Sequence, residues 1–316
     1  MQQPSFQNKV SSTKKALFTF KILSAALLVT LLYRYTLSKN LMEYVQAIHY
    51  NWLLSGVALT VPVIILRAKR WSLIVAENGV VMDNKTLFDV YVPSFMLGLI
   101  TPGRVGELIR CKYLFDKGLS IRTSFLTLVF DRLFDIIPTI FISTLFGFYA
   151  IDKGVDAFTK QLLLIIASGA VILCLVLLIF SLWKRRKQTK SEIRGFAYSP
   201  ILIFKCALIS ISSMLISAIQ VYFFASSVEL ETTLFESFGF ASLSALVSQL
   251  PIGIGGIGSR DLVLVYLLEQ AGNHVETAFL FAQTFNITSV CLMLTGLIML
   301  IWTYMEPHHL RRKRTI

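Results

Sequence analysis

The sequence is poor in charge and cysteine, and each shortage excludes a class of protein. Only 15% of the 316 residues are charged, whereas about a quarter are charged in soluble proteins. Hydrophobic residues make up 55%, with a mean hydropathy of +0.68. We therefore expect an all-α polytopic membrane protein. The four cysteines lie singly along the chain, so we expect neither a disulfide framework nor a CxxC metal site.

Recognisable catalytic patterns are also missing. The four histidines are single loop residues or lie in the basic C-terminal segment, and the H-E-x-x-H, G-x-S-x-G, P-loop and paired-aspartate patterns are absent. A G-x-G-x-x-G pattern occurs at 253–258, but it follows a proline between apolar runs and not a strand, so we do not expect a nucleotide site. We predict no metal ion and no cofactor, and we favour a protein without enzymatic activity.

The net charge of +12 has its origin in short basic segments between apolar runs. Arg67, Lys69 and Arg70, for example, follow the second run, where we expect a loop. This distribution is typical of cytoplasmic loops, so we predict an inner (plasma) membrane protein with both termini in the cytoplasm and no binding to nucleic acid. The basic segments 184–190 and 311–314 are candidates for contacts with anionic headgroups, although orientation in the membrane alone explains them.

Six apolar runs are long enough to span a bilayer, which takes roughly 20 helical residues. They cover residues 16–37, 51–66, 124–151, 161–183, 200–228 and 277–304. Two further apolar regions, 91–115 and 238–268, are each broken by a turn of Pro and Gly that is followed by an Arg and an acid. If each region returns to its own side of the membrane, most basic segments face the cytoplasm. We therefore predict six transmembrane helices plus two re-entrant helical hairpins.

The two broken regions also indicate an internal repeat, because Pro251 follows Pro102 by 149 residues. The same offset brings the apolar runs of the two halves into register. Each half then has two helices, a hairpin and a third helix, and three crossings invert the second half relative to the first, as in many transporters. We divide the single membrane domain, 1–316, into repeat one at about 10–152, repeat two at about 153–306 and a basic cytoplasmic tail at 307–316.

Charged residues at the hairpin turns and in the run 124–151 are the candidate binding residues. A helix N-terminus beside an arginine suits an anion such as a lipid phosphate, although internal ion pairs that lock the hairpins together are an alternative. Asp131 and Asp135 share a helix face, where they line a polar pathway or lie among headgroups. The predicted substrate-binding residues are Arg104, Glu107, Arg110, Asp131, Arg132, Asp135, Arg260 and Asp261. The predicted turn residues are Pro102, Gly103, Gly106, Pro251, Gly253, Gly255, Gly256 and Gly258.

Three segments carry a resemblance to a known family: TPGRVGELIR (101–110), VFDRLFD (129–135) and LPIGIGGIGSRD (250–261). Together they resemble the lysylphosphatidylglycerol synthase transmembrane-region family, also called flippase-like proteins, over nearly the whole chain. The resemblance implies an integral inner-membrane protein, and in the best-known member such a domain moves aminoacylated phosphatidylglycerol between leaflets. Members often have Glu where this chain has Asp261. After Tyr304 only a short basic segment follows, so we do not expect synthase activity.

The function predicted on these grounds is that of a flippase-like protein that binds or translocates an anionic phospholipid or a polyprenyl-linked headgroup. One alternative is a membrane-embedded glycosyl- or acyltransferase acting on a lipid carrier, with Glu107, Asp131 or Asp135 as base, or an accessory subunit of such an enzyme. Another is a non-transporting protein that binds a cytoplasmic enzyme through 184–194.

Overall fold

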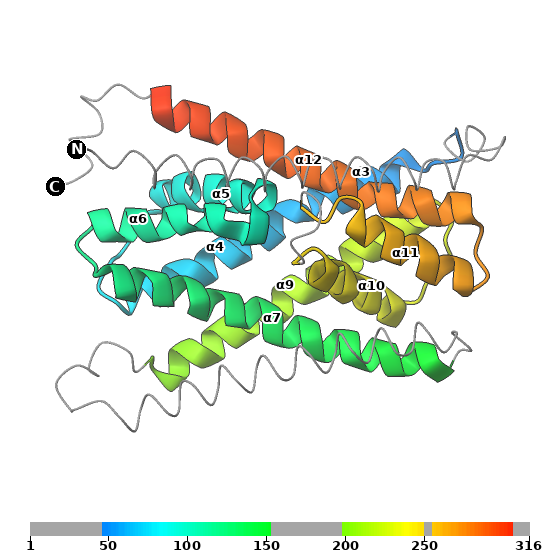
Figure 1. Cartoon of the computed structure of the whole chain (residues 1–316), viewed down its shortest axis with the longest axis horizontal. Helices are drawn as coiled ribbons and strands as arrows, with labels where there is room; N and C mark the ends of the chain where they lie inside the picture. Colours follow the sequence, from blue (N-terminus) through cyan, green and yellow to red (C-terminus); the bar gives the residue numbers. More distant parts are fainter. Residues whose placement is uncertain (1–45, 153–197, 250–254, 306–316) are drawn as a thin grey trace, which may run out of the picture.

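A computed structural model of the chain describes residues 46–152, 198–249 and 255–305, and these residues form helices and connecting turns without a strand among them (Figure 1). Four long helical runs extend along the bundle. They are α3 (Tyr50–Ala58) continued by α4 (Thr60–Ala76), α7 (Ile121–Asp152), α9 (Pro200–Ser227) and α12 (Val275–Met305). Two helical hairpins complete the described part. The first consists of α5 (Asn84–Ile100), η1 (Pro102–Leu108) and α6 (Ile109–Asp116), and the second of α10 (Leu234–Val247) and α11 (Ser259–Gln270).

Three of the long runs in the described part have the length and composition of membrane-spanning helices: 50–76, 200–227 and 275–301, with mean hydropathies of 1.6, 2.1 and 2.0. Large apolar side chains such as Phe204 and Ile298 are exposed on α9 and α12, which suits contact with lipid tails. The helix α7 covers the predicted run 124–151. The predicted runs 16–37 and 161–183 lie outside the described residues.

The run formed by α3 and α4 extends further than the predicted 51–66. It is interrupted at Leu59 because Pro62 has no N–H to bond to the carbonyl of Ala58. Gln220 of α9 compensates at this break, since its Nε2 donates to the Gly56 carbonyl at 3.0 Å and to Thr60 Oγ1 at 2.7 Å. The helix then continues to Ala76. The expected loop at 67–70 is therefore wrong, and its basic residues project from a helix.

Both hairpins are inserted between long helices that come from the two halves of the chain. The first arms α5 and α10 pack against α12 and α7, whereas the second arms α6 and α11 pack against α7 and α12. In Figure 1 the hairpins enter the bundle from opposite ends and their turns face each other near its middle. A Cβ atom at Gly255 would lie 3.7 Å from the Cβ of Leu99 at the end of α5, so the second turn lies beside the end of α5.

Glycines permit this close packing of the hairpins. A Cβ atom at Gly106 of η1 would lie 2.4 Å from the backbone carbonyl carbon of Leu97, and one at Gly239 of α10 would lie 2.1 Å from the ring of Phe146 on α7. Real Cβ atoms do not approach other atoms so closely, so any larger residue would push the helices apart. Gly106 thus sets how closely η1 packs on α5 within the first hairpin, and Gly239 sets how closely α10 packs on α7.

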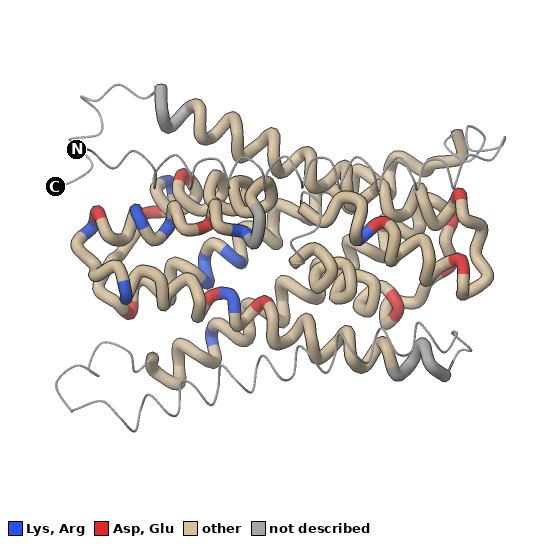
Figure 2. Tube along the Cα trace, viewed as in Figure 1, with Lys and Arg blue, Asp and Glu red and all other residues tan. Residues whose placement is uncertain are grey.

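Charge is distributed unevenly along the bundle. Lys and Arg gather in the half that contains α4, the first hairpin and the start of α7, whereas acidic residues predominate at the opposite end (Figure 2). Only the first half therefore holds a concentration of arginines between its helices, and the candidate site lies there.

Candidate functional site

The first half of the bundle is built around Arg70, which projects from the last two turns of α4 and is completely buried. Its Nε donates to Asp131 at 2.8 Å and its Nη2 pairs with Asp135 at 2.8 Å. The two aspartates lie one turn apart on α7, so their carboxylates can flank a single guanidinium. Arg70 Nη1 also donates to Ser210 Oγ on α9 at 2.8 Å. One side chain thus joins three long helices.

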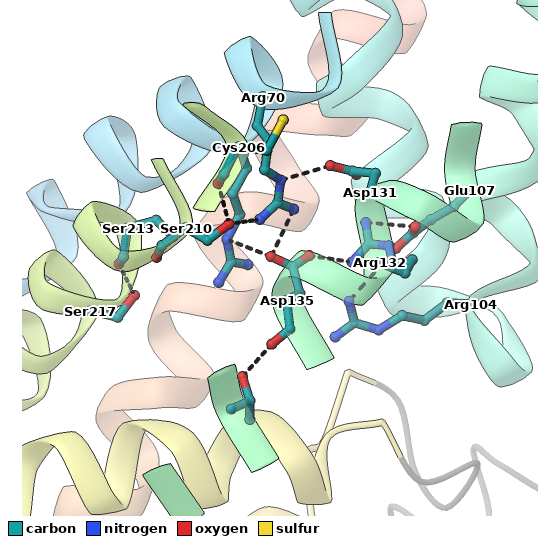
Figure 3. A network of polar contacts seen from close by, with 12 residues as sticks. Arg70, Arg104, Glu107, Asp131, Arg132, Asp135, Cys206, Ser210, Ser213 and Ser217 are labelled. Atoms are coloured by element: carbon teal, nitrogen blue, oxygen red, sulfur yellow. Dashed lines mark hydrogen bonds and ion pairs between the residues drawn. The ribbon is translucent and has the colours of Figure 1, made fainter. Parts of the chain in front are cut away.

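Two more arginines and a glutamate extend these contacts into a closed ring. Figure 3 labels the members of this ring other than Arg110. Arg110 of α6 pairs with Asp131 at 3.2 Å and with Glu107 at 2.7 Å. Arg132 of α7 pairs with Glu107 at 2.7 Å and with Asp135 at 3.1 Å. Guanidinium and carboxylate groups alternate around this arginine–carboxylate ring, whose members are Arg70, Asp131, Arg110, Glu107, Arg132 and Asp135.

The ring is formally neutral, since three arginines face three carboxylates. An unpaired charge at this depth would cost several kcal/mol. Alternation gives every charged group two opposite neighbours, and none of the six side chains is more than 14% exposed. The ring therefore holds η1 and α6 against α4 and α7.

Neighbouring residues of the first half make room for the ring. A Cβ atom at Gly98 of α5 would lie 2.6 Å from Glu107 Cγ, so glycine at this position leaves space for the glutamate. The guanidinium of Arg110 lies over the buried rings of Trp71 and Tyr91, 5.3 and 4.9 Å from their centroids. Such cation–π contacts stabilise an arginine that water cannot reach.

Two further arginines contact the ring without belonging to it. Arg104 Nη1 lies 3.6 Å from Glu107 Oε1, and Arg67 Nε lies 3.9 Å from Asp135 Oδ1. Both distances exceed every ion-pair distance within the ring, and these side chains are 19% and 24% exposed. The positive charges of Arg67 and Arg132 also repel Arg104. Because the ring is neutral, Arg67 and Arg104 leave the cluster with two excess positive charges.

The backbone of Arg104 is strained. Its φ of 57° lies in the left-handed region, which costs a residue other than glycine roughly 1–2 kcal/mol. Thr101 fixes the turn that precedes it, because Thr101 Oγ1 donates to the Leu97 carbonyl at 2.6 Å and accepts from Gly106 N at 2.7 Å. Strain of this kind clusters at functional sites. Here the strained residue is Arg104, which contacts the ring only at 3.6 Å.

Arg260 and Asp261 form a second, separate cluster at the start of α11. Asp261 accepts from Gly258 N at 3.0 Å and from Asn286 Nδ2 of α12 at 2.8 Å. Arg260 donates to Asn286 Oδ1, lies 3.5 Å from Asp261 and stacks over Phe285 at 5.1 Å. Only 5% of Arg260 is exposed. One arginine and one aspartate leave this cluster formally neutral.

The structure thus brings six of the eight predicted binding residues together and leaves Arg260 and Asp261 apart from them. Within the described part of the chain, no hydrogen bond or ion pair connects the two clusters. Sequence reasoning missed Arg67 and Arg70 because it ended the helix at Leu66. The signal for a longer helix was the apolar face that continues through Trp71, Ile74 and Val75, all buried in the structure.

The predicted turn residues fall into three groups. Gly255, Gly256 and Gly258 have φ values of 60°, 88° and 89°, as a tight glycine turn requires. Pro102 and Gly103 lie at the start of η1, with Gly106 further along the same element. Pro251 and Gly253 lie outside the described residues.

Comparison with known families agrees with these motifs. A family model of the lysylphosphatidylglycerol synthase transmembrane region matches residues 18–296, which include both hairpins and the arginine–carboxylate ring. The chain belongs to this family. Among curated proteins, none matches the chain. Membership makes the chain a membrane protein related to lipid modification or translocation, and the ring joins the family motifs around 104–110 and 131–135 in space.

Proposed function

We propose that the protein binds the anionic headgroup of a membrane lipid and moves it between leaflets, with Arg67 and Arg104 as the groups that contact the headgroup phosphate. The observation that carries the proposal is the pair of excess positive charges beside a neutral, closed ring. A guanidinium suits phosphate because its planar fork donates two parallel hydrogen bonds. Both arginines are more exposed than any ring member, so a ligand can reach them without breaking the ring.

The arrangement of the hairpins supports the transport step. Each first arm packs against the last long helix of the other half, and Gly255 of the second turn lies beside Leu99 at the end of α5. This exchange of partners supports an inverted repeat of 10–152 and 153–306. Rocking of one half against the other would expose the arginines to each side in turn. The basic end of the bundle would face the cytoplasmic side of the cell's inner membrane, and both termini would lie on that side.

The transferase alternative assigns the role of base to Glu107, Asp131 or Asp135. Each of these carboxylates is engaged by two ring arginines. A substrate hydroxyl would have to displace an arginine before it could transfer its proton, so this geometry favours a binding role. The enzyme-partner alternative depends on residues 184–194, which lie outside the described part of the chain.

The test uses the full-length protein in vesicles of neutral phosphatidylcholine that contain a trace of fluorescent phosphatidylglycerol. Membrane-impermeant dithionite quenches the outer leaflet, and continued quenching reports movement from the inner leaflet. We expect Arg104→Ala to slow this movement by at least about tenfold, which corresponds to about 1.4 kcal/mol. The matched control is Arg122→Ala, because Arg122 is an exposed arginine at the start of α7. It should behave like the unmodified protein.

Two outcomes would overturn the proposal. One is movement of the fluorescent lipid at the same rate in the unmodified protein and in a folded Arg104→Ala variant. The other is formation of a lipid-linked product by purified protein that is lost in Asp131→Asn, which would establish the transferase instead. Gel filtration and thermal unfolding of each variant in detergent show whether it is folded.

A further inference from the structure

The charge of the site restricts the class of headgroup that it can bind. We infer that the headgroup carries two negative charges on phosphate, as a phosphomonoester or a diphosphate does, in contrast to the single charge of a phosphodiester. The inference rests on the proposed function and specifies the substrate class of that site.

The charge balance of the cluster supports this inference. The connected cluster contains five arginines and three carboxylates. The ring accounts for three of each, so the excess of two charges belongs to Arg67 and Arg104. In a low-dielectric interior an uncompensated charge is unfavourable. A dianionic headgroup neutralises both arginines, whereas a phosphodiester leaves one of them uncompensated.

The hydrogen-bond donors of the cluster agree with this count. Arg67 Nε and Arg132 Nε are buried and have no hydrogen-bond partner within the described residues. A terminal phosphate group offers three strong acceptor oxygens, while the phosphate of a diester has two oxygens free of ester bonds. More acceptors let the ligand satisfy donors on both α4 and α7 at once.

An amino group on the ligand would find little to bind. All three carboxylates of the cluster are already paired with ring arginines. An ammonium group beside Arg67 and Arg104 would add repulsion. The site therefore disfavours an aminoacylated headgroup.

The experiment compares three lipids with the same acyl chains: phosphatidic acid, phosphatidylglycerol and lysylphosphatidylglycerol. Each is titrated into full-length protein in a neutral detergent and bound lipid is counted by native mass spectrometry. The measurement is made at about pH 8, well above the second phosphate pKa of about 6. We expect phosphatidic acid to bind at least about tenfold more tightly than phosphatidylglycerol, and the lysylated lipid to bind more weakly than either.

Two variants at one position isolate the second charge. Arg67→Gln should bring the affinity for phosphatidic acid down to that for phosphatidylglycerol, and continued binding of phosphatidylglycerol shows that the variant is folded. Arg67→Lys keeps the charge and should keep the preference. Arg67 is suited to this test because its ion pair is the longest in the cluster, at 3.9 Å. If Arg67→Gln loses both lipids, Arg67→Lys decides whether the charge matters. A preference for phosphatidic acid that survives in Arg67→Lys supports the inference, and a preference that is lost there overturns it.

Failure of the inference and failure of the proposed function give different results. Equal affinities for phosphatidic acid and phosphatidylglycerol, both lost in Arg104→Ala, would overturn the dianion inference and leave the proposed function intact. Unchanged binding of every lipid in Arg104→Ala would overturn both. Displacement of phosphatidic acid by an equal concentration of soluble pyrophosphate would identify a free anion as the ligand and so contradict a lipid headgroup.

Discussion

The two hairpins have similar shapes and different electrostatic character. The first places Arg104, Glu107 and Arg110 within seven consecutive residues, and their contacts reach both α4 and α7. The second has one charged pair, Arg260 and Asp261, which is closed by α12. One cluster has an excess of positive charge and the other is neutral. Similar hydropathy therefore conceals different roles, which depend on the number of opposite charges that each hairpin meets.

The turns of the two hairpins also differ, in the residues that adopt positive φ. In the second turn three glycines occupy the positive-φ region, where glycine carries little steric cost. In the first turn the positive-φ residue is Arg104 itself. The first hairpin thus holds its loosely paired arginine in a strained conformation, whereas the positive-φ residues in the described part of the second turn are all glycines. We interpret the first hairpin as the ligand-binding arm and the second as the element that closes against it.

The largest expected difference between the hairpins concerns their buried aspartates. Asp131→Asn removes the charge that faces both Arg70 and Arg110, and it should lower the free energy of unfolding by about 3–5 kcal/mol. Asp261→Asn retains an oxygen that can accept from Gly258 N, so we expect a loss of about 1.5–3 kcal/mol. Denaturant titrations of both variants in detergent micelles measure the difference. A larger loss of unfolding free energy for Asp261→Asn would contradict the view that the ring stabilises the helix packing more than the second cluster does.

An intermediate effect is expected from one added methyl group in each hairpin. Gly98→Ala presses on Glu107, which cannot move aside while it is paired with Arg110 and Arg132. We expect a loss of about 1–3 kcal/mol in stability, together with weaker binding of anionic lipid because Arg104 shifts with Glu107.

The matched variant in the second hairpin is Gly239→Ala, which presses on Phe146. It should lose a similar amount of stability and keep its lipid affinity. Unfolding titrations and lipid binding by native mass spectrometry separate the two effects. Equal loss of lipid affinity in both variants would remove the functional distinction between the hairpins.

The smallest effect concerns the N-caps. Asp83 accepts from Thr86 N at 3.2 Å at the start of α5, and Thr233 accepts from Glu236 N at 3.2 Å at the start of α10. Replacement of either cap by Ala should cost about 1 kcal/mol. Hydrogen bonds from Thr86 lower the pKa of Asp83 below its ordinary value of 3.8. The contribution of this cap is therefore complete above that value and is lost as the pH falls through the lowered pKa.

Thermal unfolding of Asp83→Ala at neutral and acidic pH checks this sign. The difference from the unmodified protein should shrink on acidification. A difference that grows as the pH falls would show that the carboxylate has another role.

Much of the helical layout follows from local pattern. The predicted run 200–228 corresponds to α9 at 200–227, and the run 277–304 corresponds to α12 at 275–305. Proline and glycine placed both hairpin turns correctly because their effects on the backbone are local. The predicted end of α4 was wrong because three basic residues resemble a loop when their buried partners are unknown. Those partners are distant in sequence: Ser210 follows Arg70 by 140 positions.

The amino-acid sequence by itself determined a helical membrane protein, the positions of its two broken regions and the family to which the chain belongs, because apolar length, proline and glycine act over short distances. Only the tertiary structure decided which charges are paired. It closed six residues of α4, η1, α6 and α7 into a neutral ring and left Arg67 and Arg104 outside it, since pairing depends on distances between side chains that no spacing along the chain encodes.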